Sequence, residues 1–150
     1  MDALVKAKTG TGKTLAFLIP SIQLLIENPR SNAKDIPCII VSPSRELAHQ
    51  IAVEAKLLLQ NTPHLKALCI TGGTSIRGDH SALQQRISFL IATPGRLIDH
   101  LRNSSGFADR VKMCQTLVLD EADTLLVRRT DTTSIIHFYK YSSPSIITHI

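Results

Sequence analysis

The chain has 150 residues, 43% hydrophobic and 19% charged, a composition typical of one globular domain and unlike that of a disordered tail. Lys and Arg outnumber Asp and Glu by 17 to 12, so the net charge of +5 permits a polyanionic partner without demonstrating one. No apolar run is long enough to span a bilayer. The three cysteines lie far apart without CxxC spacing, so we expect no disulfide framework, no zinc site and reduced thiols in an intracellular protein.

Short apolar runs alternate with longer amphipathic segments from residue 2 to residue 119. This order predicts an α/β fold with a doubly wound parallel sheet, right-handed crossovers and ligand sites at the carboxyl ends of the strands. In the segment 45–59, Leu47, Ile51, Ala55 and Leu58 recur at three- and four-residue steps, so we expect that face to dock on the sheet. The expected strands are residues 3–7, 37–42, 65–72, 87–93 and 115–120, and the expected helices are residues 13–27, 45–59, 81–86 and 96–102.

A glycine-rich loop, AKTGTGKT at residues 7–14, connects the first expected strand to the first helix and departs from the G-x-x-x-x-G-K-[ST] pattern at its first residue. Gly10 and Gly12 let the loop curl with its backbone N–H groups inward, which makes a nest for phosphate oxygens. Lys13 can then reach the outer phosphates, and the Thr14 hydroxyl at the helix N-terminus is suited to bind Mg²⁺. The alternative is a turn that only caps a helix.

Three carboxylates follow the buried strand expected at residues 116–119. Asp120 would emerge at the same edge of the sheet as the phosphate loop, which makes it a candidate partner of Mg²⁺. Phosphoryl transfer needs a metal to neutralise developing charge and a group to orient the attacking water, and Asp120 with Glu121 supplies both parts. A solvated acidic turn is the alternative, and the residues alone leave the role of Asp123 open.

Five motifs occur in the order and approximate spacing of the DEAD-box RNA helicases: AKTGTGKT, PSRELAHQ at 43–50, Gly72 with Gly73, TPGR at 93–96 and DEAD at 120–123. Residues 2 to about 127 therefore resemble most of the first of that family's two RecA-like lobes, which are P-loop NTPase folds. The phrase KAKTGTGKTLAFLIP is similar to the branch that includes organellar helicases of fungi and plants. The resemblance implies ATP and Mg²⁺ as cofactors, RNA as partner and ATP-dependent RNA remodelling as the activity.

The resemblance also implies roles for single residues. Asp120 would coordinate the metal through water, Glu121 would orient or activate the hydrolytic water, and Asp123 would link the nucleotide state to the RNA-binding face. Lys13 joins Asp120 and Glu121 in the expected catalytic set, and Thr14 joins Asp120 as the expected metal ligands. The expected ATP-binding residues are Ala7, Lys8, Thr9, Gly10, Thr11, Gly12, Lys13 and Thr14.

The remaining three motifs follow expected strands and would share one edge of the sheet. Their hydroxyls, glycine N–H groups, helix N-termini and arginines are groups that contact phosphates without reading bases, so RNA binding would be sequence-independent and salt-sensitive. Singly, each motif reads as an ordinary turn: Ser44 could cap its helix, and Arg45 and Glu46 could pair with neighbours. The expected RNA contacts are Pro43, Ser44, Arg45, Gly72, Gly73, Thr93, Pro94, Gly95 and Arg96. The histidines, including His100, lack ligand spacing and are expected on the surface or on helix faces.

The chain departs from the family at both ends. Only six residues precede the phosphate loop, where the family has a segment that reads adenine. From Thr130 to Ile150, eight of 21 residues are Ser or Thr and five are Ile, without a helical stripe. We therefore expect residues 1–127 to form the lobe and residues 128–150 to lie outside the fold, in place of the Ser-Ala-Thr strand that would partner Asp123.

The second helicase lobe is not part of these 150 residues, and neither are the arginines that would complete the ATP site. We expect a monomer that binds nucleotide and RNA without unwinding, because catalysis depends on assembling both lobes around the transition state. Two other functions remain compatible with the motifs: a non-enzymatic nucleotide- or RNA-binding protein, and a P-loop ATPase that acts on DNA.

Overall fold

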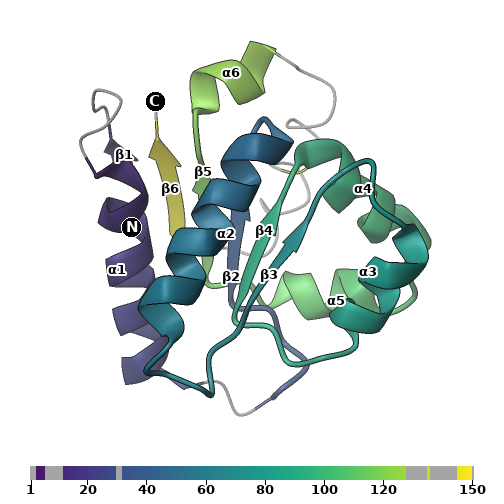
Figure 1. The fold of residues 1–150 in the computed structure, drawn as a ribbon, viewed down its shortest axis with the longest axis horizontal. Helices are drawn as coiled ribbons and strands as arrows, with labels where there is room; N and C mark the ends of the chain where they lie inside the picture. The colour runs from purple at the N-terminus through teal and green to yellow at the C-terminus, as the bar shows by residue number, and fades with distance from the viewer. Residues whose placement is uncertain (1–2, 6–11, 30–31, 128–134, 136–144, 150) are drawn as a thin grey trace.

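The computed structural model describes residues 3–5, 12–29, 32–127, 135 and 145–149. They form a six-stranded sheet with the order β1-β6-β5-β2-β4-β3, in which every neighbouring pair is parallel (Figure 1). The α/β class is confirmed, and each of the five expected strands is found inside its expected range. The strands are β1 Ala3–Val5, β2 Cys38–Val41, β3 Ala67–Ile70, β4 Phe89–Ala92, β5 Thr116–Leu119 and β6 Ser145–His149.

Two helices, α1 (Lys13–Glu27) and α2 (Arg45–Leu59), have the expected bounds. Two others begin earlier than expected, α3 (Ile76–Leu83) by five residues and α4 (Pro94–Asn103) by two, and α3 also ends three residues earlier than expected. In α4 the proline occupies the first turn, where its fixed φ favours a helix start and its missing N–H costs nothing. The short helices α5 (Phe107–Lys112) and α6 (Ala122–Val127) were not expected, since six residues are too few to display a periodic pattern.

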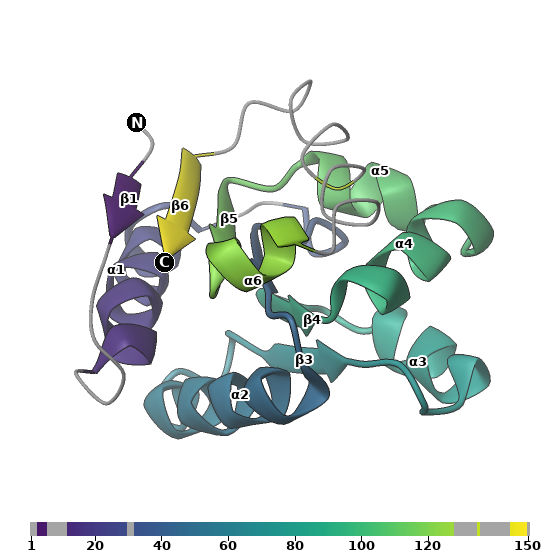
Figure 2. The ribbon, with the colours of Figure 1, turned by 90° about the horizontal axis from the view of Figure 1, so that it is seen from above.

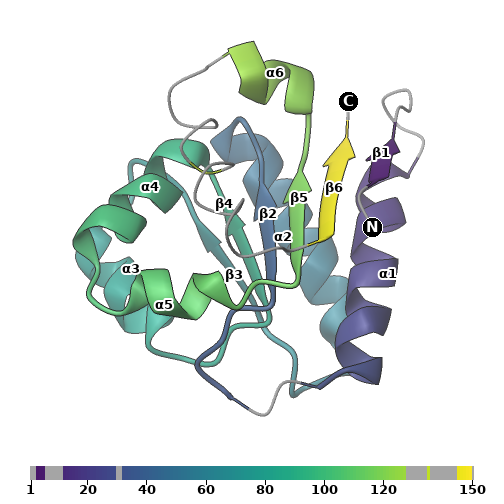
Figure 3. The same cartoon turned by 180° about the vertical axis from the view of Figure 1, so that it is seen from behind.

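The helices cover both faces of the sheet, as Figures 2 and 3 show from two further directions. Along β2, Cys38 and Ile40 enter the core beneath α1 and α2, whereas Ile39 and Val41 enter the core beneath α3, α4, α5 and α6. This alternation is the period of two that a strand imposes on its side chains. Among the described helices, none combines the length and the hydropathy that crossing a membrane requires.

Helix α2 docks on the sheet through a face that differs in part from the expected one. Ile51 and Ala55 are buried as expected, but Leu58 is 36% exposed and Leu47 is only half-buried. The buried stripe includes the residues that follow Leu47, Ile51 and Leu58 in the sequence, so it is rotated about the helix axis relative to the expected one. Its small side chains let the helix approach the strands closely. Its members are Ala48, Ile51, Ala52, Ala55 and Leu59.

The structure corrects the expectation that residues 128–150 lie outside the fold. Ser145–His149 form β6, which pairs with β1 on one side and with β5 on the other. Ile135 is fully buried in the core beneath α4 and α6. Without β6, the facing edges of β1 and β5 would have unpaired backbone N–H and C=O groups. The sequence of β6, which pairs with both edges, is Ser-Ile-Ile-Thr-His, where the family resemblance implied Ser-Ala-Thr. Residues 128–134, 136–144 and 150 are outside the described part.

The cysteines are free thiols, as their spacing predicts. Cys38 and Cys114 are buried and Cys69 is half-buried. Desolvation by burial raises the pKa of Cys38 well above its usual value, and it raises the pKa of Cys69 to about 11. Cys38 and Cys69 are therefore protonated and poorly nucleophilic at neutral pH.

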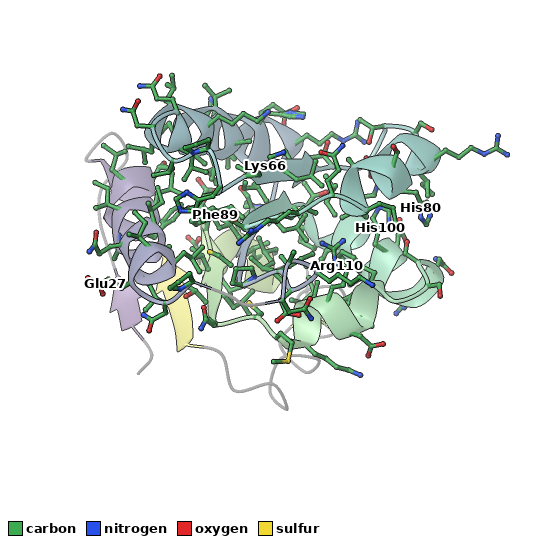
Figure 4. The ribbon with its side chains drawn as sticks, turned by 90° about the horizontal axis from the view of Figure 1, so that it is seen from below. Glu27, Lys66, His80, Phe89, His100 and Arg110 are labelled. Carbon is green, nitrogen blue, oxygen red and sulfur yellow. The ribbon has the colours of Figure 1, made fainter. Side chains whose placement is uncertain are left out.

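Arg110 ties the amino-terminal ends of the strands together, and Figure 4 shows it among the side chains at that end of the molecule. Its guanidinium donates hydrogen bonds to the backbone carbonyl of Lys34, in the loop before β2, and to those of Leu83 and Gln85, at the end of α3 and in the turn that follows it. Burial lowers the pKa of Arg110 from its ordinary value. Arginine nevertheless stays charged in proteins, so it can hold these carbonyls at any physiological pH.

Candidate functional site

The first helix begins without the usual side-chain cap. Gly12 occupies the N-cap position in the left-handed conformation, with φ 78°, which glycine adopts at no steric cost. No side chain caps this end, and the first turn contains no acidic residue. The first-turn N–H groups therefore carry partial positive charge with no side-chain acceptor supplied, which is the arrangement that binds phosphate. Residues 7–11 of the loop lie outside the described part.

A cavity of about 720 Å³ brings the two halves of the expected ATP site together. Gly12, Lys13 and Thr14 line it from the start of α1, and Asp120 and Glu121 line it from the end of β5. These residues are more than a hundred positions apart in the sequence, and the parallel sheet unites them because both follow the carboxyl end of a strand. The remaining lining comes from Leu15 and from the outer face of α2, namely Leu47, Gln50, Glu54, Leu57 and Leu58.

Asp120 is 9% exposed and is held by the strand beside its own. Its backbone N–H donates to the carbonyl of Val41 at 2.9 Å, and the hydroxyl of Ser42 donates to Asp120 Oδ2 at 3.4 Å. Ser42 was not among the expected site residues. A signal for it exists in the sequence, since a serine directly after an apolar strand will lie at the same sheet edge as Asp120 if the two strands are neighbours.

Glu121 has φ 47°, and it is the one non-glycine residue with positive φ in the described part of the chain. Such a conformation costs on the order of 1–3 kcal/mol and is found disproportionately at functional sites. Its carbonyl accepts from the N–H of Leu125 at 3.0 Å and so starts α6. The backbone strain fixes the direction in which the carboxylate leaves the strand. Asp123, by contrast, is exposed on α6 and accepts a hydrogen bond from the N–H of Thr124 at 2.8 Å.

A second cavity, of about 500 Å³, collects the three motifs expected to contact RNA, and we call it the backbone groove. The expected residues are thus on one edge of the sheet, with two carboxylates, Glu46 and Asp99, beside them. Gly73 does not line the groove itself, although Gly72 does. The lining residues are Pro43, Ser44, Arg45, Glu46, Gly72, Thr93, Pro94, Gly95, Arg96 and Asp99.

Arg45 lies across the glycine pair. A side-chain carbon added to Gly73 would overlap Arg45 Nη1 and would lie 2.9 Å from Arg45 Cζ. Because Arg45 is a flexible, exposed side chain that can move aside, the firmer requirement for glycine is the left-handed backbone of Gly73, with φ 86°. Arg45 itself is exposed, and within the described ranges it forms no ion pair, so its guanidinium remains available to an anion.

Ser44 and Thr93 hold the backbone around the groove. The Ser44 hydroxyl accepts from the N–H of Leu47 at 3.2 Å, so it caps α2, as one interpretation of the sequence held. Thr93 precedes α4 but does not cap it with its side chain. Its hydroxyl instead accepts from the N–H of Gly72 at 3.4 Å and links two of the motifs.

Arg96 is placed very differently from Arg45. Its side chain is 5% exposed and forms an ion pair with Asp79, from Nε to Oδ2, at 2.7 Å. Its Nη2 donates to the carbonyl of Thr74 at 2.7 Å. His100, expected on the surface or on a helix face, lies on the buried face of α4 with 1% exposure, and its Nε2 lies 3.1 Å from the same Asp79 oxygen. Figure 4 shows His100 beside His80 in the region of α3 and α4.

Within the described residues, no group of three or more His, Cys, Asp or Glu is arranged to hold a metal ion. In the 720 Å³ cavity, Thr14 and one buried carboxylate, Asp120, lie with the N-terminus of α1. Magnesium retains several waters and is commonly bound through one or two carboxylates plus the phosphates of a substrate. The residues present therefore fit a magnesium–nucleotide complex better than a metal bound by protein alone.

Comparison with known proteins agrees with this geometry. The family model for the DEAD/DEAH box helicases matches residues 1–148. The chain is 49% identical over 126 residues to the DEAD-box ATP-dependent RNA helicase 26 of Oryza sativa subsp. japonica, covering 83% of this chain and 23% of that protein. It is 48% identical over 130 residues to the DEAD-box ATP-dependent RNA helicase 25 of Arabidopsis thaliana, again with 83% and 23% coverage. The chain thus spans about a quarter of these relatives.

Among solved structures, Mss116p bound to ssRNA and AMP-PNP superimposes with a TM-score of 0.91 at 34% identity, covering 99% of this chain and 31% of that one. The coverage includes β6, so the sixth strand has a counterpart in that fold. All three comparisons agree with the site described above, in which the helix after the phosphate loop lies beside the paired carboxylates. The chain belongs to the DEAD/DEAH box helicase family, in the region of its N-terminal RecA-like domain.

Proposed function

We propose that this chain is the ATP- and RNA-binding lobe of an ATP-dependent RNA helicase that remodels RNA duplexes. The observation that carries the proposal is the 720 Å³ cavity, which joins Lys13 and Thr14 to Asp120 and Glu121. Lys13 and the open end of α1 bind the phosphates, together with residues 7–12 of the loop. Thr14 and Asp120 hold Mg²⁺, largely through water, and the metal supplies charge neutralisation at the phosphates.

Glu121 is proposed to orient the attacking water, because its carboxylate leaves the strained turn next to Asp120. Asp123 is proposed to couple the nucleotide site to the RNA face. The acceptor groups for that coupling differ from the family's Ser-Ala-Thr, since β6 has Ser-Ile-Ile-Thr-His at this place in the sheet.

RNA is proposed to bind in the backbone groove. Arg45 contributes an exposed guanidinium, and the first turn of α4 contributes the N–H group of Gly95, whereas the N–H of Gly72 is already donated to the Thr93 hydroxyl. These groups recognise phosphate and not base edges, so affinity should depend on salt far more than on sequence. The solved relative Mss116p is bound to ssRNA and AMP-PNP, which supports both ligands for this chain.

The proposal is tested with the 150-residue chain itself. Fluorescent ATP analogues should bind in the presence of Mg²⁺, and labelled single-stranded RNA should bind at low salt. Incubation with the chain and ATP should separate the strands of a short RNA duplex no faster than in its absence. The absence of unwinding follows because the second side of the catalytic cleft is not in these residues. RNA-stimulated ATP hydrolysis at the rate of a two-lobe helicase would contradict this part. Preferential displacement of the RNA by a DNA competitor would favour a DNA-directed ATPase instead.

A further inference from the structure

The side chains behind the backbone groove form a buried polar cluster whose centre is Asp79. Its Oδ2 accepts from Arg96 Nε at 2.7 Å and lies 3.1 Å from His100 Nε2. His100 Nδ1 lies 2.7 Å from the Ser104 hydroxyl, so both ring nitrogens are engaged. The side chains of Arg96, His100 and Asp79 are 5%, 1% and 13% exposed. A buried charge is stable only when it is paired and hydrogen-bonded, and each of these groups is.

The cluster connects two of the three segments that line the groove, the Gly72 loop and the start of α4. Arg96 Nη2 donates to the carbonyl of Thr74 at 2.7 Å and to its hydroxyl at 3.1 Å. The Thr74 hydroxyl in turn donates to the carbonyl of Thr71 at 2.9 Å, which closes the turn that contains Gly72 and Gly73. Arg96 belongs to the TPGR motif, so its guanidinium ties the glycine loop to the first turn of α4.

Asp79 determines where that guanidinium points. Without the carboxylate, Arg96 would be a buried cation whose Nε lacks its acceptor, and it would turn toward solvent through the groove that it lines. The turn at Gly73, over which Arg45 lies, would then be linked to the start of α4 only by the longer hydrogen bond from Gly72 N–H to the Thr93 hydroxyl, at 3.4 Å. The spacing between the phosphate-binding groups of the two motifs would be held less firmly.

We propose that Asp79 is a positioning residue for RNA binding: it orients Arg96 and thereby fixes the Gly72–Thr74 loop against the Thr93–Gly95 turn. His100 restrains the same carboxylate oxygen from the opposite side. The inference rests on the proposed binding of RNA in the backbone groove. Asp79 is outside all five motifs on which the family resemblance depends, and it makes no contact with the expected ligand itself.

Whether removal of the carboxylate weakens or strengthens RNA binding distinguishes a positioning role of Asp79 from a simple electrostatic one. Removing a carboxylate near a polyanion strengthens binding by Coulomb's law. Asp99 is exposed and lines the groove, so Asp99→Ala should tighten RNA binding. Asp79→Ala removes the same charge, yet we expect it to weaken RNA binding about 10-fold, since an oriented charged hydrogen bond is lost. Asp79→Asn retains an acceptor oxygen and should weaken binding by roughly 3-fold.

The measurement is the fluorescence anisotropy of a labelled single-stranded RNA titrated with the full chain, at a temperature where circular dichroism shows each variant folded. Asp109→Ala is the matched control, because its exposed carboxylate only pairs with Lys112 at 3.0 Å. If Asp79→Ala fails to fold, Asp79→Asn decides the question. Unchanged or tighter binding by the folded Asp79 variants would overturn the inference while leaving the proposed function in place. Failure of the unsubstituted chain to bind RNA would overturn both.

Discussion

The 720 Å³ cavity that we propose binds nucleotide, here called the nucleotide cavity, and the backbone groove both use residues of α2. They are built from very different ranges of sequence. Residues 43–99 supply the whole lining of the groove, so β2, β3 and β4 with their following helices suffice to form it. The nucleotide cavity needs α1, α2 and the end of β5, and β1, the strand before its phosphate loop, pairs only with β6 in the described part of the sheet. The groove is therefore a local structure, and the cavity depends on both ends of the chain.

Breaking β6 gives the largest expected effect and tests this difference directly. In Ile147→Pro a proline replaces the residue that pairs with Ala3 on one side and Val118 on the other, and it removes a ladder donor from a strand paired on both sides, where proline is not tolerated. We expect nucleotide binding to be lost and RNA affinity to fall much less. Ile147→Val is the control. Equal loss of both activities would show that the two sites are not independent.

Removing the Lys13 amine should affect one site alone. We expect Lys13→Ala to weaken Mg²⁺–ATP binding roughly 30-fold, since a hydrogen bond to a charged group is lost, and to leave RNA binding unchanged. Lys66→Ala removes the same charge from an exposed residue that directly precedes β3 and does not line the cavity; Figure 4 labels it. If Lys13→Ala altered neither ligand, a non-enzymatic role would be favoured over an ATPase.

The fit between Arg45 and Gly73 can be isolated with two alanines. Gly73 and Gly106 have similar backbone strain, with φ 86° and 73°, but a Cβ would meet Arg45 only at Gly73 and would meet nothing within 4 Å at Gly106. Both substitutions should cost about 1–2 kcal/mol of stability from positive φ. Only Gly73→Ala should also weaken RNA binding. Thermal unfolding and anisotropy together measure the two parts, and equal RNA affinities would contradict the role of Arg45.

Arg45 itself should behave as a direct phosphate contact. We expect Arg45→Ala to weaken RNA binding about 10-fold and to reduce the slope of log affinity against log salt by about 0.7, one phosphate's share on a single strand. Arg102→Ala, which removes an exposed charge from the far end of α4, should change the slope little. An unchanged slope for Arg45→Ala would place the phosphate contact elsewhere in the groove.

The smallest expected effect concerns the strained turn at Glu121. Glu121→Gly relieves the positive φ, so this variant should be more stable than Glu121→Gln by about 0.5–1 kcal/mol. Neither variant should lose Mg²⁺–ATP binding, because Glu121 is proposed to act on water. Denaturant unfolding measures the difference. If Glu121→Gly were the less stable of the two, the left-handed backbone would not be a source of strain.

The sequence predicted correctly those elements whose bounds depend on residues close together in the chain. The bounds of α1 and α2 follow from a phosphate loop, a serine cap and helical periodicity, all within one stretch of chain. The strand β6 could not be predicted, because its five residues acquire a role only from the gap that β1 and β5 leave between them. Asp79 and His100 were missed for the same reason, since their partner lies on another helix and no spacing rule connects them.

The position of β6 also has a consequence for how the protein is made. The strand before the phosphate loop leaves the ribosome first, and the strand that holds it in the sheet leaves last. At about 5–20 residues per second, the nascent chain spends a few seconds with its backbone groove complete and the edges of β1 and β5 still open. We therefore expect a translation product that stops short of Ser145 to form the backbone groove without an assembled nucleotide cavity.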